Sequence, residues 1–420
     1  MKKWMSLLLV AAMTMSLLAG CSGSTTEGTD STDTAAEATD ETATADDAEA
    51  TDEAEATDET AASSDETFKI GGIGPVTGGA AVYGIAVKNA TELAINEINA
   101  AGGINGYQVE FNFQDDELDN EKSVNAYNTL KDWGMNMLVG CVTSGCCIAV
   151  AAETQNDNMF QLTPSGSSVD IVEGNENVFQ VCFTDPNQGV GAAQYIGENG
   201  LATKVAVIYD SSDVYSSGIY TKFAEEAANQ NFEIVSAEAF TADNKTDFSV
   251  QLSKAQEAGA ELVFLPIYYT EASLILAQAD SMGYAPKFFG CDGLDGILGV
   301  ENFDTSLAEG VMLLTPFAAD AEDEATQNFV SAYEAAYGET PNQFAADAYD
   351  CVYAIYEACQ AAGVTADMSA EDICEALVAE FTGDFTFNGL TGSNMTWGTN
   401  GEVSKTPVVC KITDGQYADM

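Results

Sequence analysis

The chain has 420 residues and a formal net charge of −54, and all thirteen of its basic residues are Lys, so it contains neither Arg nor His. This large negative charge repels nucleic acid and anionic lipid, which are therefore poor partners. The lack of histidine excludes Ser-His-Asp and Cys-His nucleophilic sites and the HExxH zinc site, which leaves only carboxylates, Lys, Tyr or Cys for any catalysis.

Residues 1–20 have the pattern of a secretion signal. Lys2 and Lys3 precede an apolar run over residues 7–18, and small residues then stand before Cys21. The run is too short to span a hydrocarbon core of about 30 Å comfortably. The sequence around Cys21 resembles the acceptor site of a bacterial lipoprotein signal, which implies cleavage and lipidation at that residue. We expect a protein anchored by lipid; the alternative is a plain signal peptide with an incidental cysteine.

Residues 21–67 are predicted to be a lipidated cysteine followed by a disordered acidic tether. The stretch 22–67 carries sixteen Asp or Glu residues among Thr, Ala and Ser, and has no Lys or aromatic residue. Such a composition cannot bury enough apolar surface to offset the entropy lost on ordering. A flexible chain of this length has an end-to-end distance of roughly 35–40 Å. A solvated spacer is therefore a simpler interpretation than a specific binding segment.

From residue 68 on, short apolar runs alternate with segments of helical period. A strand over 68–72 precedes a helix over 83–100, which Gly102 and Gly103 end. Repeated strand, helix, strand units imply parallel sheets covered on both faces, with ligands bound at the carboxyl ends of the strands. Further strands are predicted over residues 108–113, 137–140, 178–183, 205–209, 233–237, 262–265, 287–290 and 311–314.

This order predicts an α/β protein with two doubly wound parallel-sheet lobes. We assign residues 68–184 and 316–385 to the first lobe, and residues 185–315 and 386–420 to the second. The region after 316 has too few strands for a third lobe, so its helices are expected to return to the first. Several chain crossings between two lobes form a hinge that permits closure around a ligand. The predicted helices of this region cover residues 321–337, 341–362 and 369–381.

No metal or cofactor is predicted. Nine cysteines remain beyond Cys21, an odd number that cannot all pair, and most lie in apolar stretches where a free thiol acts as a small buried hydrophobe. Three of them, between residues 141 and 147, lack the usual zinc spacing. The stretch that starts at Asp115 resembles a calcium-binding loop, but Asn120 stands where the loop needs Gly and Ala126 where it needs Glu. The stretch that starts at Gly72 resembles a dinucleotide-binding motif, but Thr77 replaces its last glycine.

Several motifs, taken in order, closely resemble periplasmic binding proteins for branched-chain amino acids. The resemblance implies the type I binding-protein fold and a lipoprotein that delivers an amino acid to the permease subunits of an ATP-driven importer. It also implies that the chain is not an enzyme, and we expect a monomer. The motifs are Gly74-Pro75-Val76-Thr77-Gly78, Tyr83-Gly84, Ala94-Ile95-Asn96-Glu97-Ile98-Asn99, Gly102-Gly103-Ile104-Asn105-Gly106, Asp115-Asp116, Leu162-Thr163-Pro164-Ser165 and Ala348-Tyr349-Asp350.

The resemblance also implies where the ligand binds. Ser144, Ser165 and Ser167 match positions at which the family holds the α-carboxylate with a hydroxyl and backbone N–H groups, which suits a chain without Arg. The alternative is a purely structural role, in which Ser144 only caps the following helix. Asp292 matches the acidic group for the α-ammonium, where many relatives have Glu. Aromatic walls are expected from Tyr83, Tyr215 and Tyr268, with Tyr269 and Phe344 as further candidates.

Two departures from the family pattern concern the side-chain pocket. Relatives often have a disulfide between the loops that follow the second and third strands, but this chain has no cysteine near Glu117 that could pair with Cys141, Cys146 or Cys147. Cys146 and Cys147 also stand in a stretch that is usually rich in Ser. The expected ligand is a branched-chain or other apolar amino acid, but these changes leave its identity open. The alternative function is a ligand-sensing component of a membrane receptor system, since the same fold serves signalling.

Overall fold

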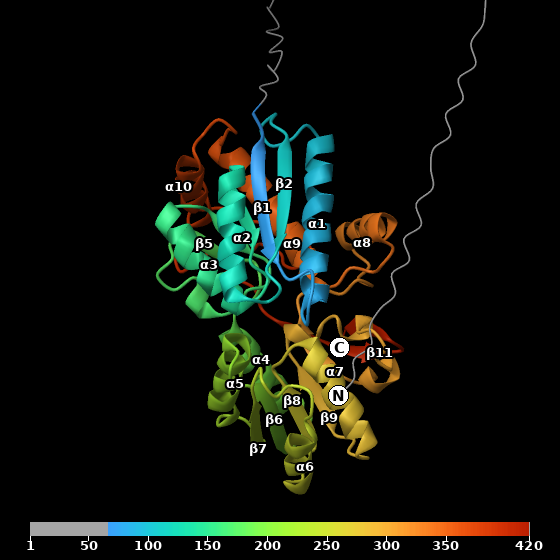
Figure 1. Ribbon diagram of the computed structural model, residues 1–420. Helices are drawn as coiled ribbons and strands as arrows, with labels where there is room; N and C mark the ends of the chain where they lie inside the picture. Colours follow the sequence, from blue (N-terminus) through green and yellow to red (C-terminus); the bar gives the residue numbers. More distant parts are fainter. Residues whose placement is uncertain (1–65, 420) are drawn as a thin grey trace, which may run out of the picture. The chain divides into compact units, whose positions relative to one another are not determined.

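The computed structural model describes residues 66–419. The predictions for the signal peptide, for Cys21 and for nearly all of the tether lie outside these residues. The described chain forms two sheets of mostly parallel strands flanked by helices (Figure 1), which confirms the predicted fold class. Every predicted strand and helix is present, with each end within three residues of its predicted position.

The first lobe is built on a five-stranded parallel sheet with the order β2-β1-β3-β4-β5. Its strands are β1 (Phe68–Gly74), β2 (Val109–Asp115), β3 (Met137–Gly140), β4 (Gln161–Thr163) and β5 (Val178–Gln180). Helices α1 (Ala81–Ala100), α9 (Gln343–Ala362) and α10 (Ala370–Phe381) pack on one face, and α2 (Asn120–Trp133) and α3 (Ser144–Asp157) pack on the other. The late helices α9 and α10 thus lie with the earliest strands of the chain (Figure 1).

The second lobe is built on a seven-stranded sheet with the order β12-β11-β10-β9-β8-β6-β7. Its strands are β6 (Lys204–Asp210), β7 (Glu233–Phe240), β8 (Leu262–Leu265), β9 (Lys287–Gly290), β10 (Met312–Thr315), β11 (Val408–Thr413) and β12 (Gln416–Asp419). Helices α4 (Asp185–Glu198) and α5 (Val214–Ala227) cover one face, and α6 (Ser249–Glu257) and α7 (Tyr269–Ser281) cover the other. Helix α8 (Glu324–Tyr337) follows β10 and contacts α1.

The hairpin of β11 and β12 was not predicted, although the sequence of its turn is typical of a two-residue hairpin. Asp414 and Gly415 connect the two antiparallel strands and both have positive φ angles, of 52° and 75°. An Asp-Gly pair is a preferred two-residue hairpin turn because glycine adopts this conformation without strain. The hairpin adds two antiparallel strands to an otherwise parallel sheet and so completes its edge.

The segment between residues 386 and 405, which we assigned to the second lobe, packs against the first. Phe387, Met395 and Trp397 belong to the apolar core around β1 and β3. The indole Nε1 of Trp397 donates to the carbonyl oxygen of Gln180 at 2.7 Å. A buried indole N–H needs such an acceptor, and the end of β5 supplies it. The chain returns to the second sheet only at β11, which pairs with β10.

A buried ion pair holds this segment just before the chain crosses to the second lobe. The Lys405 ammonium lies 2.7 Å from a carboxylate oxygen of Asp347 and 2.6 Å from the hydroxyl of Thr391, and its side chain is only 2% exposed. Thr391 in turn donates to Asp350. Because both charges are desolvated, loss of one partner would leave the other buried and unpaired.

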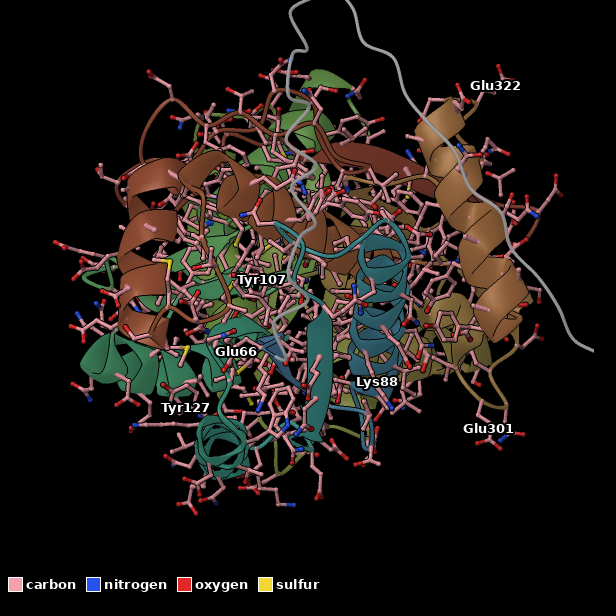
Figure 2. All side chains as sticks on the ribbon, turned by 90° about the horizontal axis from the view of Figure 1, so that it is seen from above. Glu66, Lys88, Tyr107, Tyr127, Glu301 and Glu322 are labelled. Carbon is pink, nitrogen blue, oxygen red and sulfur yellow. The ribbon has the colours of Figure 1, made fainter. Side chains whose placement is uncertain are left out.

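All nine cysteines of the described chain are buried, which agrees with their prediction as small apolar side chains. Charged groups such as Glu301 and Glu322 project from the periphery (Figure 2). Within residues 66–419, no helix combines the length and apolarity required to cross a membrane.

Gly84 is required by a close approach between α1 and the loop after β1. A Cβ atom at Gly84 would lie 2.0 Å from the carbonyl oxygen of Pro75, a backbone atom that cannot move aside cheaply. We expect Gly84→Ala to lower the free energy of unfolding by about 1–3 kcal/mol or more, as overpacking does. Urea unfolding followed by circular dichroism measures this change.

Gly79→Ala is the matched control, because a Cβ atom at Gly79 has no neighbour within 4 Å. Its free energy of unfolding should stay close to that of the wild type. Equal stability of the two variants would contradict the steric argument.

Candidate functional site

A small cavity lies where loops from both sheets meet, and six of the seven predicted ligand residues line it. These loops follow the carboxyl ends of parallel strands, which is where this type of sheet binds ligands. The cavity has a volume of about 10 Å³, roughly the room of one water molecule. An amino acid therefore requires the two lobes to separate or the lining side chains to move. The six residues are Tyr83, Ser144, Ser165, Tyr215, Tyr268 and Asp292.

Ser144 provides a hydrogen-bond donor on the first lobe. It is the first residue of α3, where the backbone N–H groups of the first turn have no acceptor within the helix. Its Oγ accepts hydrogen bonds from the N–H groups of Ser167 and Ser168, both at 3.2 Å. Because Oγ already accepts two bonds, its proton is free to be donated into the cavity. A helix start with a hydroxyl donor favours an anion such as a carboxylate.

Ser165 and Ser167 offer no free hydroxyl donor to the cavity in this structure, and their part in holding a carboxylate stays a prediction. The Ser165 hydroxyl donates to the carbonyl oxygen of Val142 at 2.7 Å, so its proton is already used. Ser167 does not line the cavity, and its Oγ is buried without a hydrogen-bond partner among the described residues. Its contribution is the backbone N–H that holds Ser144 in place. The two serines therefore shape the loop around Ser144.

Asp292 is a buried carboxylate on the second lobe. It follows β9, is 4% exposed, and accepts a hydrogen bond of 2.7 Å from the hydroxyl of Tyr215. Burial raises the pKa of Asp292 to about 7, although the bond from Tyr215 opposes this shift. None of the residues that line the cavity is cationic. A ligand ammonium would therefore meet a carboxylate that has no competing protein cation in the cavity.

Aromatic rings from both lobes close the cavity. Tyr215 and Tyr268 of the second lobe are stacked with ring centroids 5.0 Å apart, and Tyr83 of the first lobe packs on Phe344 at 4.2 Å. The Tyr83 hydroxyl donates to the carbonyl oxygen of Gly293 and accepts a bond of 3.3 Å from the N–H of Tyr269. Tyr83 thus links the two lobes directly. Tyr269 contacts its ring but does not line the cavity.

Sequence reasoning missed three lining residues, namely Val142, Thr143 and Gly293. Thr143 directly precedes Ser144, so its place after the same strand was a usable signal. No sequence signal marked Gly293, because its role depends on packing. A Cβ atom at this position would lie 2.6 Å from the hydroxyl of Tyr215. Only a glycine allows the chain after Asp292 to pass this close to Tyr215.

A second, larger cavity borders the first. It has a volume of about 390 Å³, and its walls come from both lobes. Thr143, Tyr215 and Tyr268 line both cavities, so the two spaces share a wall of three side chains. The Oγ1 of Thr143 is buried at this boundary and has no hydrogen-bond partner among the described residues.

The sequence is similar to known binding proteins over most of its length. The family model described as "Periplasmic binding protein" matches residues 67–416. A "Leucine-, isoleucine-, valine-, threonine-, and alanine-binding protein" of Pseudomonas aeruginosa is 29% identical over 329 residues, which are 78% of this chain and 85% of that protein. A "Leu/Ile/Val-binding protein homolog 3" of Brucella melitensis is 32% identical over 307 residues, which are 72% of this chain and 81% of that protein.

A solved structure has the same architecture. The branched-chain amino acid transporter substrate-binding protein LivJ of Streptococcus pneumoniae, in complex with isoleucine, has a TM-score of 0.76 and 29% identity, and the match covers 84% of this chain and 98% of that one. The match to the family model covers more than half of the chain, including every strand of both sheets except β12 and all residues that line the cavity. The chain belongs to the periplasmic binding protein family, whose members bind solutes and are not enzymes.

Proposed function

We propose that the chain captures an amino acid between its two lobes and delivers it to an ABC importer. One observation carries this proposal: the Ser144 hydroxyl and the start of α3 on the first lobe line the same cavity as the Asp292 carboxylate of the second. This arrangement is complementary to a zwitterion, with donors for the α-carboxylate and an acceptor for the α-ammonium. The relatives named for leucine, isoleucine and valine support the same ligand class.

Binding is proposed to close a hinge between the lobes. Tyr83 on one lobe and Gly293 on the other are joined by a hydrogen bond, and Thr270 donates to the carbonyl oxygen of Gly79 at 2.7 Å. These bonds exist only when the lobes are together. A ligand that contacts both walls interacts better with the closed than with the open form, and this difference drives closure.

Calorimetry with the twenty amino acids and their deaminated analogues tests the proposed function. We expect saturable binding of at least one α-amino acid and much weaker binding of the same molecule without its ammonium group. Binding of the deaminated analogue with equal affinity would show that the site recognises organic acids instead. Thermal shifts in the same panel give an independent readout, because a ligand of the folded state raises its apparent stability.

The protein is further proposed to act at the outer face of the membrane, held there by lipid on Cys21. We expect Cys21→Ser to release the protein into the medium without a change in amino-acid affinity, since the cysteine lies far along the sequence from the binding residues. Acyl chains contribute about 0.8 kcal/mol per buried methylene, and a chain with a net charge of −54 is not attracted to an anionic membrane surface that could replace this contribution. Fractionation and calorimetry of both forms measure the two effects, and a variant that remained in the membrane fraction would contradict lipid anchoring.

A further inference from the structure

The larger cavity beside the amino-acid site is charged, and an ammonium already lies in it. The Lys245 ammonium is 3.0 Å from a carboxylate oxygen of Glu271, and both residues line this cavity. The Glu271 side chain is only 8% exposed, so its carboxylate is held within the protein. Lys245 shows that the cavity accepts a cation at the end of an aliphatic chain.

Lys245 is a displaceable occupant. It lies on the exposed loop between β7 and α6, and its side chain is 39% exposed. A long side chain on such a loop can turn into water, and a ligand cation that takes its place keeps the buried Glu271 carboxylate paired. Glu271, by contrast, is fixed in the first turn of α7 and stays in the cavity.

The remaining charges favour a cation as well. Asp210 and Asp213 line the same cavity, so its walls carry three carboxylates against the single ammonium of Lys245. If Lys245 turns away, a ligand cation in its place keeps this balance, whereas an anionic or purely apolar group would leave the three carboxylates without a cation in the cavity.

Asp292 lines the smaller cavity and Glu271 lines the larger one. The ring of Tyr83, in the wall of the smaller cavity, packs on the ring of Tyr269, which stands two residues before Glu271 at the start of α7. A ligand with an ammonium at each end can reach both carboxylates, because the cavities share the wall of Thr143, Tyr215 and Tyr268.

We propose that the site takes amino acids with an extended cationic side chain, whose α-ammonium pairs with Asp292 and whose terminal cation pairs with Glu271 in place of Lys245. This inference rests on the proposed amino-acid function and narrows its ligand class. Thr143 lines both cavities, so its side chain is part of their common wall.

Lysine and norleucine are compared directly, because norleucine has the same carbon chain as lysine but lacks the terminal amine. Calorimetry on the whole protein should show that lysine binds at least about tenfold more tightly than norleucine, a difference of 1.4 kcal/mol. Lys245→Met removes the internal competitor and should tighten lysine and arginine binding by about tenfold while leaving leucine within about twofold. Glu271→Gln should abolish the preference for lysine over norleucine.

Lys254→Met is the matched control, because Lys254 pairs with Glu238 on the surface and does not line the cavity. It should change no affinity. Binding of leucine and norleucine without binding of lysine or arginine, in the wild type and in Lys245→Met, would overturn the cationic specificity and leave the proposed function standing. If no amino acid bound to any variant, both proposals would fall. Equal effects of Lys245→Met on leucine and lysine would also contradict the assignment, since they would indicate a general change in closure.

Discussion

Asp292→Asn is expected to weaken amino-acid binding by about 2–5 kcal/mol. The substitution keeps the size of the side chain and the hydrogen bond with Tyr215 but removes the charge that pairs with the ligand ammonium. Because both groups are buried in the complex, the loss includes the cost of an ammonium left desolvated and unpaired. Calorimetry with the tightest-binding amino acid measures the effect, and circular dichroism verifies that the variant is folded.

Ser144→Ala and a deaminated ligand provide the comparison. Ser144→Ala should cost only about 1–3 kcal/mol, because the backbone N–H groups of the α3 start remain available to the carboxylate. A ligand without its α-ammonium gains nothing from the charge of Asp292 and should bind Asp292→Asn as well as wild type, or better. An unchanged amino-acid affinity in Asp292→Asn would contradict the assignment of the ammonium site.

The pKa of Asp292 adds a pH dependence to the same interaction. Its carboxyl titrates near pH 7 in the free protein, and a bound ammonium stabilises the ionised form. Binding below pH 7 must therefore release a proton, so wild-type affinity should fall by up to about tenfold for each pH unit below this value. Asp292→Asn should show no such decline between pH 7 and 5. Proton release can be measured directly by calorimetry in buffers of different ionisation enthalpy.

The unliganded protein is expected to become more stable as the pH falls from 8 towards 5. Several buried carboxyl groups have raised pKa values, chiefly because burial disfavours their charged form. Burial raises the pKa of Asp116 and of Asp350 to about 6 and that of Asp292 to about 7, from an ordinary value of 3.8. Burial also raises the pKa of Asp185 and Asp295.

The sign of the effect follows from proton binding. Between about pH 4 and pH 7 these groups hold protons in the folded state and have lost them in the unfolded state. The folded state therefore binds more protons, and the free energy of unfolding rises as the pH falls through this window. Each unit of pKa difference corresponds to about 1.4 kcal/mol, so together the groups are expected to contribute several kcal/mol. Below about pH 4 the contribution is complete and the increase ends.

Asp116→Asn tests whether the buried carboxyl groups cause the rise in the free energy of unfolding at lower pH. One carboxylate oxygen of Asp116 accepts the N–H of Leu118 at 3.0 Å, and the other is buried without a hydrogen-bond partner among the described residues. Replacing this group should flatten the rise in stability between pH 7 and 5. Asp243→Asn, on an exposed loop, is the matched control for the loss of one carboxylate. Urea unfolding at a series of pH values gives the comparison, and a wild type whose stability falls steadily from pH 8 to 5 would contradict the expectation.

The sequence by itself determined the two-sheet architecture and the neighbourhood of the site. Alternating strand and helix patterns identify parallel sheets, and the carboxyl ends of parallel strands lie at one edge. Ser144 after β3, Tyr268 after β8 and Asp292 after β9 were named from the resemblance to binding proteins, and their places after parallel strands agree with a common site. They line one cavity in the structure. Local periodicity was enough for the sheets, and the family resemblance was needed to name the residues of the site.

The tertiary structure alone decided how each group is used. Ser165 donates to Val142, Ser167 does not line the cavity, and Trp397 packs the segment after residue 386 against the first lobe. Lys245 reaches Glu271 across 26 positions of sequence, and no local pattern marks that pair. The physical reason is the same in each case. A polar side chain takes whichever partner the packed structure places within about 3 Å, and that partner comes from a segment distant in sequence.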